Sequence, residues 1–130
     1  MRFLILAFAL TMSIAWNSGI GAEPSASSKA EIGALLDRLG ASGCQFNRNG
    51  TWYGSVKAKA HLARKLDYLL DRKLVESPEQ FIALAGTKSS QSGEEYQVKC
   101  GNEAAVSSAA WLTAQLKELR EKNSQGAAEK

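Results

Sequence analysis

The sequence predicts an α+β fold: about four helices with a small two- or three-stranded antiparallel sheet, in a single domain stapled by a disulfide. Apolar residues recur at helical spacing in four separate segments, which predicts the helices. An Asn-Gly pair between two short stretches that favour strands is typical of a tight hairpin. Cys44 and Cys100 are the only cysteines, and they can pair if the protein leaves the cytoplasm.

Residues 1–22 have the pattern of a secretory signal peptide. Arg2 precedes the apolar run from Phe3 to Trp16, and small residues follow, with a cut expected after Gly21 or Ala22. A membrane span needs roughly 20 apolar residues, and polar residues interrupt this run before that length. We therefore expect cleavage, no stable membrane insertion afterwards, and a periplasmic or secreted protein.

The rest of the chain has the size of one small domain, expected over residues 28–122. A core of this size has little stability to spare, so a Cys44–Cys100 bridge would contribute a large share, about 4 kcal/mol by loop entropy. Two free buried thiols are the alternative. Residues 123–130 are polar and are expected to form a flexible tail.

The first helix is expected to begin at Ser28-Lys29-Ala30-Glu31, which has the pattern of a capping box. The serine hydroxyl would accept from a backbone amide of the first turn, and the glutamate would reach back to the cap. Gly40 and Gly43 are typical of a helix end. Between these signals lies the expected core stripe of Ile32, Leu35, Leu36 and Leu39.

A hairpin is expected around Arg48-Asn49-Gly50, because Asn-Gly readily adopts the two positive φ angles of a tight turn. Ser55 follows as the expected cap of a second helix that runs to about Lys73. The core stripe of that helix would be Ala58, Leu62, Leu66 and Leu69.

Ser77-Pro78 predicts the start of a third, short helix, because proline is favoured at the first helical position. Gly86 to Gly93 is rich in serine and glycine and predicts a loop. The expected buried residues of the third helix are Phe81, Ile82, Leu84 and Ala85.

Alternating apolar residues after this loop predict a half-buried strand over residues 96–100. A bridge between Cys44 and Cys100 would place this strand beside the hairpin. A final helix is expected from about Val106 to Lys122. Its core stripe would be Ala109, Leu112, Leu116 and Leu119, with Trp111 at the edge.

The charge pattern favours no nucleic-acid partner. The formal net charge is only +3, and both signs are interspersed rather than gathered in a basic stripe. We also expect no metal or other cofactor. The chain has one histidine and two cysteines expected to be oxidised, and no carboxylates at the spacing of metal ligands.

Five segments, taken in order and spacing, form a recognisable pattern. They are Cys44-x-Phe46-x-Arg48-Asn49-Gly50, Ala58-x-x-His61-Leu62-x-x-Lys65, Phe81-Ile82, Ser89-Ser90-x-Ser92-Gly93-x-x-Tyr96-x-Val98 and Trp111-Leu112. Together these segments resemble the YfeK-like group, a family of small exported bacterial proteins of unknown function. The resemblance extends from about Ile32 to Leu119. It implies an exported single domain and carries no activity, cofactor or catalytic residue with it.

The candidate site residues come from three segments. His61 and Lys65 would share one side of the second helix, as a basic groove for an anionic group or as an ordinary solvated face. The hydroxyls of Ser89, Ser90 and Ser92 could form an anion nest, or tie the loop to its own backbone. Arg48 could form a structural ion pair or reach the serine loop.

We expect these segments to lie on one side of the molecule and to bind an anionic group if they bind anything. The main hypothesis is a non-enzymatic binding or interaction module of the bacterial envelope. Its partner would be an envelope protein or an anionic cell-wall component. One alternative is a small hydrolase that uses His61 with a serine of the Ser89 to Ser92 loop, which would need a short histidine–serine contact. Another is a purely structural envelope protein.

Overall fold

The computed structural model describes residues 23–128, so the predicted signal peptide lies outside the described residues. The predicted helices and strands occur in the predicted order, with one further strand before the last helix, and the α+β fold class is confirmed. No helix of this part of the chain has the length and apolar character needed to cross a membrane. The elements are α1 Ala26–Ala41, β1 Gln45–Arg48, β2 Thr51–Gly54, α2 Ser55–Asp71, α3 Pro78–Ala85, β3 Gln97–Lys99, β4 Val106–Ser107 and α4 Ser108–Ala128.

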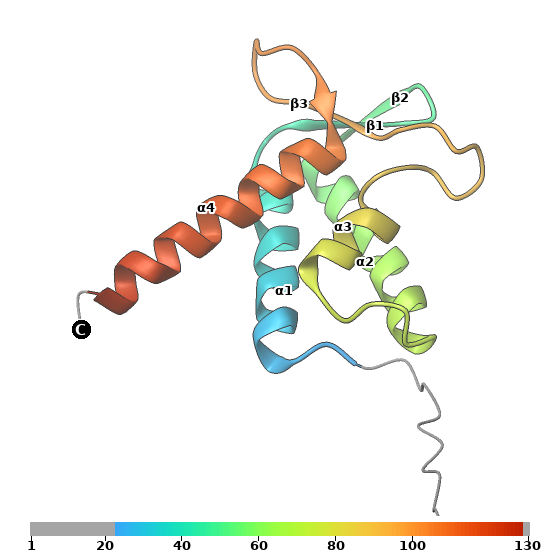
Figure 1. Cartoon of the computed structure of the whole chain (residues 1–130). Helices are drawn as coiled ribbons and strands as arrows, with labels where there is room; N and C mark the ends of the chain where they lie inside the picture. The colour runs from blue at the N-terminus through green and yellow to red at the C-terminus, as the bar shows by residue number, and fades with distance from the viewer. Residues whose placement is uncertain (1–22, 129–130) are drawn as a thin grey trace, which may run out of the picture.

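The four strands form one antiparallel sheet in the order β2-β1-β3-β4. The sheet lies at one end of the molecule, and the helices gather on one side of it (Figure 1). β4 is a fourth strand that the sequence did not predict, because Val106 and Ser107 were assigned to the last helix. A strand of two residues has no periodicity of its own, and only pairing with β3 defines it.

The hairpin between β1 and β2 turns through Asn49 and Gly50, as predicted. Both residues have positive φ, at 54° and 82°. These are the angles of a type I′ turn, which matches the twist of the two strands. The turn therefore fixes Arg48 opposite Thr51 at the tip of the hairpin.

The disulfide joins the two central strands. Cys44 and Cys100 are bonded, with their Cα atoms 4.3 Å apart. In the β1–β3 register Gln45 pairs with Lys99 and Asn47 with Gln97. Continued by one residue at each end, this register places Cys44 opposite Cys100 and Arg48 opposite Tyr96. The bridge therefore closes one end of the strand pair, and Arg48 lies at the other.

The helices pack a single core against the sheet. The core stripe predicted for α1 is confirmed, and α2 buries three of its four predicted stripe residues while Leu66 is partly buried. Leu84 was predicted to be buried, but its exposed fraction is 49%. With neighbours packed on only one side of a helix of two turns, the five consecutive apolar residues 81–85 cannot all face the core.

Besides the start of the last helix, three further predicted helix ends are wrong. α1 begins earlier, because the Oγ of Ser25, rather than that of Ser28, accepts from a backbone amide of the first turn. Ser55 does not cap α2; Gly54 occupies that position, and the Ser55 hydroxyl donates to the carbonyl of Gly40 in α1. α4 extends past Lys122 to Ala128. The flexibility predicted for residues 123–130 stays a prediction.

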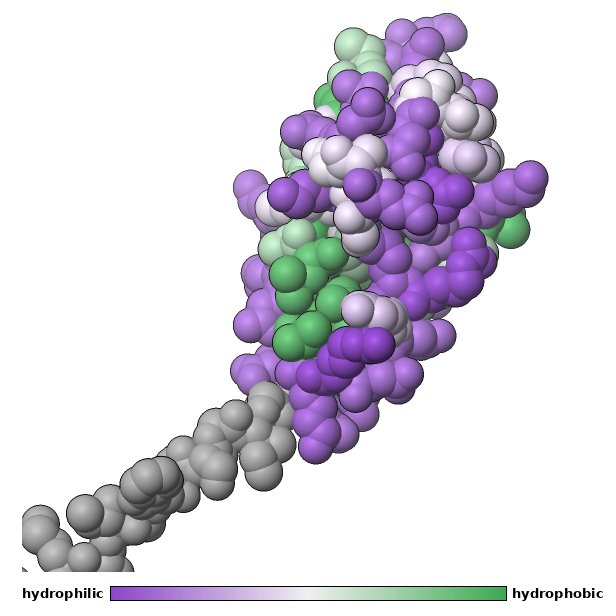
Figure 2. All heavy atoms as spheres, turned by 90° about the vertical axis from the view of Figure 1, so that its right-hand side faces the viewer, coloured by the Kyte–Doolittle hydropathy of each residue, from purple (hydrophilic) through white to green (hydrophobic). Residues whose placement is uncertain are grey.

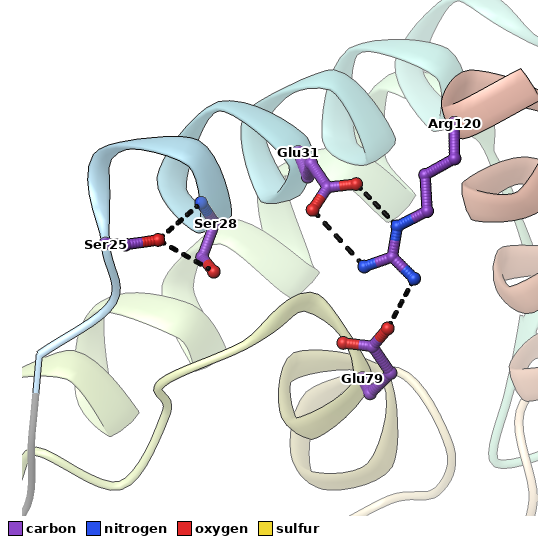
Figure 3. A network of polar contacts seen from close by, with 5 residues as sticks. All are labelled: Ser25, Ser28, Glu31, Glu79 and Arg120. Atoms are coloured by element: carbon purple, nitrogen blue, oxygen red, sulfur yellow. Dashed lines mark hydrogen bonds and ion pairs between the residues drawn. The ribbon is translucent and has the colours of Figure 1, made fainter. Parts of the chain in front are cut away.

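Arg120 connects three helices (Figure 3). From α4, its Nε and Nη2 donate to both carboxylate oxygens of Glu31 in α1, at 2.7 and 3.2 Å. Its Nη1 donates to Glu79 in α3 at 2.6 Å. Glu31 was predicted to complete a capping box, but it holds α4 instead. A planar guanidinium suits this role because its fork matches a carboxylate with two parallel bonds.

Removal of the disulfide should weaken the fold. Cys100→Ala should lower the free energy of unfolding by about 2 to 5 kcal/mol, because the reduced chain recovers the entropy of the open loop. Chemical denaturation of the oxidised protein and the variant measures this difference. An unchanged denaturation midpoint would show that the strand pair is held without its covalent link.

Loss of the Arg120 side chain should have a smaller effect. Arg120→Ala should cost about 1 kcal/mol, because the arginine is partly exposed to solvent and its pairs are screened. Lys117→Ala is the matched control on the same helix, since its contact with Glu121 is long and exposed. Equal melting temperatures of the two variants would contradict a role for Arg120 in holding the three helices.

Candidate functional site

The candidate site lies at the end of β1, next to the side chains of this strand that face the core. Side chains alternate along a strand, so Arg48 shares its face with the buried Phe46. Tyr96 lies opposite Arg48 and is 1% exposed, with its ring centroid 4.9 Å from that of Phe46. An arginine at the edge of a core-facing row needs polar partners. It finds one in α2.

His61 of α2 joins the two strands through its ring. Its Nδ1 lies 2.7 Å from Nη1 of Arg48, and its Nε2 lies 3.0 Å from the hydroxyl of Tyr96. Arginine can only donate, so Nδ1 must accept and the proton of the neutral ring must reside on Nε2. Nε2–H then donates to the tyrosine oxygen. The contacts thus define both the tautomer and the neutral state of the histidine.

Lys65 completes the cluster one turn further along α2. Its Nζ donates to the Tyr96 hydroxyl at 3.2 Å and to the carbonyl of Lys88 at 2.9 Å. The Tyr96 oxygen therefore accepts two hydrogen bonds, which uses both of its lone pairs. Its own proton has no acceptor among these partners. The site thus presents a hydroxyl donor beside two cations.

The electrostatics of the cluster favour neutral groups or bound anions. Burial, followed by the charges of Arg48, Lys65 and Arg64, lowers the pKa of His61 to about 4. Burial and Arg48 also lower the pKa of Lys65. Burial raises the pKa of the Tyr96 hydroxyl, against the opposing effect of Arg48. No carboxylate contributes to any of these shifts.

The serine loop packs against the tip of the hairpin. The buried Ser89 accepts from Nδ2 of Asn49 at 3.3 Å, and the Ser92 hydroxyl donates to Oδ1 of the same asparagine. Ser89 Oγ also lies within hydrogen-bond distance of the amides of Gln91 and Ser92, so this hydroxyl ties the loop to its own backbone. Ser90 is exposed.

Three pockets meet at His61. The serine-loop pocket, of about 300 Å³, lies between the hairpin, α2 and the loop, and is lined by Arg48, Lys65, Ser89, Ser90 and Tyr96 among others. The hairpin pocket, of about 270 Å³, lies on the other side of Arg48 and includes Tyr53, Lys57 and Arg64. The α2–α3 pocket, of about 440 Å³, includes Tyr68, Leu69 and Leu84.

The charged side chains that line these pockets are all cations: Arg48, Lys57, Arg64 and Lys65. Across residues 23–128, no salt bridge joins any of them to a carboxylate. The structural ion pair considered for Arg48 is therefore wrong. Arg48 instead lies over the ring of Tyr53, with its Cζ 5.0 Å from the centroid, and donates to His61.

Five of the six predicted site residues line the serine-loop pocket, and Ser92 contacts it through Asn49. The contact that a hydrolase would need is not formed, because the partners of the two His61 nitrogens are Arg48 and Tyr96. Within residues 23–128, three or more His, Cys, Asp or Glu side chains do not gather at any point where they could hold a metal.

Sequence reasoning missed Tyr96 and Asn49 as site residues. Tyr96 was assigned to the core by its place in an alternating strand, although a buried phenol needs a partner for its hydroxyl. That requirement could have identified it. The presence of Asn49 was attributed to the turn alone, yet the turn constrains only the backbone of this residue. Its side chain remains available to hold the serine loop.

The comparison with protein families identifies the family of this chain but no activity for it. Residues 26–120 match a family of unknown function, DUF5329. No curated protein and no solved structure matches the chain. The narrower YfeK-like assignment stays a prediction. Because the match covers nearly all of the described domain, from the start of α1 to Arg120, the chain belongs to the DUF5329 family of unknown function.

Proposed function

We propose that the protein is a non-enzymatic binding module, exported to the envelope, that holds an anionic group of an envelope protein or cell-wall component. One observation carries the proposal: three pockets that meet at His61 contain four cations and no carboxylate. The disulfide supports an oxidising compartment outside the cytoplasm.

Unpaired cations at a half-buried site are costly unless something compensates them. Arg48 and Lys65 both approach the His61–Tyr96 pair, and their mutual repulsion contributes to the lowered pKa of Lys65. A bound anion would relieve this repulsion and accept from donors that are already oriented. Arg48, Lys65 and the Tyr96 hydroxyl are the donors that the serine-loop pocket offers to it.

The same geometry favours binding over catalysis. A general base must have a free nitrogen that faces a nucleophile or a water, and both nitrogens of His61 are engaged. Ser89 and Ser92 are engaged with Asn49 and with the backbone of their own loop. The histidine acts as a spacer that keeps Arg48 and Tyr96 in place.

Arg48→Ala should weaken anion binding and leave the fold intact. Loss of one charged hydrogen bond costs about 1.5 to 3 kcal/mol, roughly a 10- to 100-fold increase in Kd. NMR titration with glucuronate measures this change, and glucose serves as the neutral probe of the same ring. Lys99→Ala is the matched control, because it removes a cation from an exposed position of β3.

Wild-type protein that fails to bind glucuronate, acetate and phosphate alike would refute an anion site. Equal binding of glucuronate and glucose would also refute it, since the pocket would then ignore charge. A fall in thermal stability of Arg48→Ala with unchanged glucuronate affinity would assign a structural role to the arginine.

Acid should destabilise the fold through His61. Between pH 6.5 and about 4 the unfolded chain protonates this histidine and the folded protein does not, so the free energy of unfolding falls as the pH falls through that window. A fall of the pKa from 6.5 to about 4 corresponds to about 3 kcal/mol at most, and because His61 is only partly buried we expect an effect on the order of 2 kcal/mol. The variant His61→Gln lacks this titration but keeps all the carboxylates of the chain, which titrate in part of the same pH range.

Denaturant unfolding of both proteins at pH 7, 5.5 and 4 tests this prediction. The stability of the wild type relative to His61→Gln should decrease with each step. A constant difference across the range would show that His61 titrates with the same pKa in the folded and unfolded chain.

A further inference from the structure

The apolar side of the site points to the kind of anion that it binds. The α2–α3 pocket shares His61, Lys65 and Ser90 with the serine-loop pocket, so the two pockets adjoin. Its remaining wall includes Tyr68 and Leu84, which are 56% and 49% exposed. Exposed apolar side chains that gather beside a pocket can mark a ligand-binding groove.

Figure 2 shows a patch of hydrophobic residues within a mostly hydrophilic surface, on the side of the molecule where α2 and α3 lie. Arg72 lies over the ring of Tyr68, with its Cζ 3.5 Å from the ring centroid, which restrains the tyrosine. The aliphatic stem of Lys65 adds apolar surface to the α2–α3 pocket, while its Nζ donates to the Tyr96 hydroxyl and to the carbonyl of Lys88.

We infer that the ligand is a monomeric anionic amphiphile, whose acidic head occupies the serine-loop pocket and whose single alkyl chain lies in the α2–α3 pocket. This inference rests on the proposed function and names its ligand class. An alkyl chain suits the α2–α3 pocket because it makes no hydrogen bonds. A peptide would bring amide donors. Both nitrogens of His61 are already engaged, so Ser90 and Tyr68 are the neutral side chains of this pocket that remain to accept them.

The affinity of straight-chain carboxylates should rise with chain length. Each methylene that leaves water contributes enough to raise affinity about two- to fourfold, until the chain outgrows the pocket. Calorimetric titration with acetate, hexanoate, octanoate and decanoate, each below its micelle concentration, measures the trend. Decyl maltoside supplies the same chain without the charge, and should bind far more weakly than decanoate.

Leu84→Ser separates the two parts of the ligand. It should weaken decanoate binding several-fold and leave glucuronate binding unchanged, because glucuronate has no chain to contact the leucine. Val56→Ser is the matched control: it removes an exposed apolar side chain from α2, 74% exposed and outside the three pockets. It should change neither affinity.

Each possible result bears on a definite claim. If acetate and decanoate bind equally, the amphiphile is refuted and the anion site stands. If decyl maltoside binds as tightly as decanoate, the anionic amphiphile is refuted, and the preference for glucuronate over glucose decides whether the anion site stands. If no anion binds, both proposals fail. If the protein sediments with vesicles of anionic phospholipid but does not bind monomeric decanoate, the partner is a membrane surface and the inference is overturned.

Discussion

The pairing of β1 with β3 is the constraint on which the rest of the structure depends. One register places Cys44 opposite Cys100 at one end and Arg48 opposite Tyr96 at the other. A slip of one residue would turn Phe46 and Val98 out of the core and would separate the cysteines. The disulfide and the core therefore select the same register, and that register places a cation beside a buried phenol.

His61 turns this pairing into a site. Its ring lies between Arg48 and Tyr96, accepts from one and donates to the other, so that both side chains are held without any carboxylate. A salt bridge would have satisfied Arg48 more simply, but it would also have neutralised it. A neutral histidine holds the arginine and leaves its charge uncompensated. The lowered pKa of the ring follows from the same arrangement, because burial and the surrounding cations oppose protonation.

Such a site reduces the stability of a small domain, since it keeps cations near one another and leaves apolar side chains exposed. Other parts of the fold offset this cost. The disulfide reduces the entropy of the unfolded chain, and Arg120 links α4 to α1 and α3 on a part of the molecule distinct from the pockets at His61. The chain thus places its charge pairs where they hold helices together and omits them where the pockets meet.

The sequence by itself determined the elements that local chemistry controls: the Asn49-Gly50 turn, the Ser77-Pro78 helix start, the core stripe of α1 and the alternation that defines β3. It also indicated Arg48, His61 and the serine loop, because an Asn-Gly turn and a disulfide would bring those segments together. Only the tertiary structure decided the partners. Glu31 serves Arg120 rather than its own helix end, β4 exists because β3 pairs with it, and Tyr96 belongs to the site because its hydroxyl meets His61. Each of these contacts joins residues far apart in the chain, and local periodicity carries no information about which distant group will satisfy a polar atom.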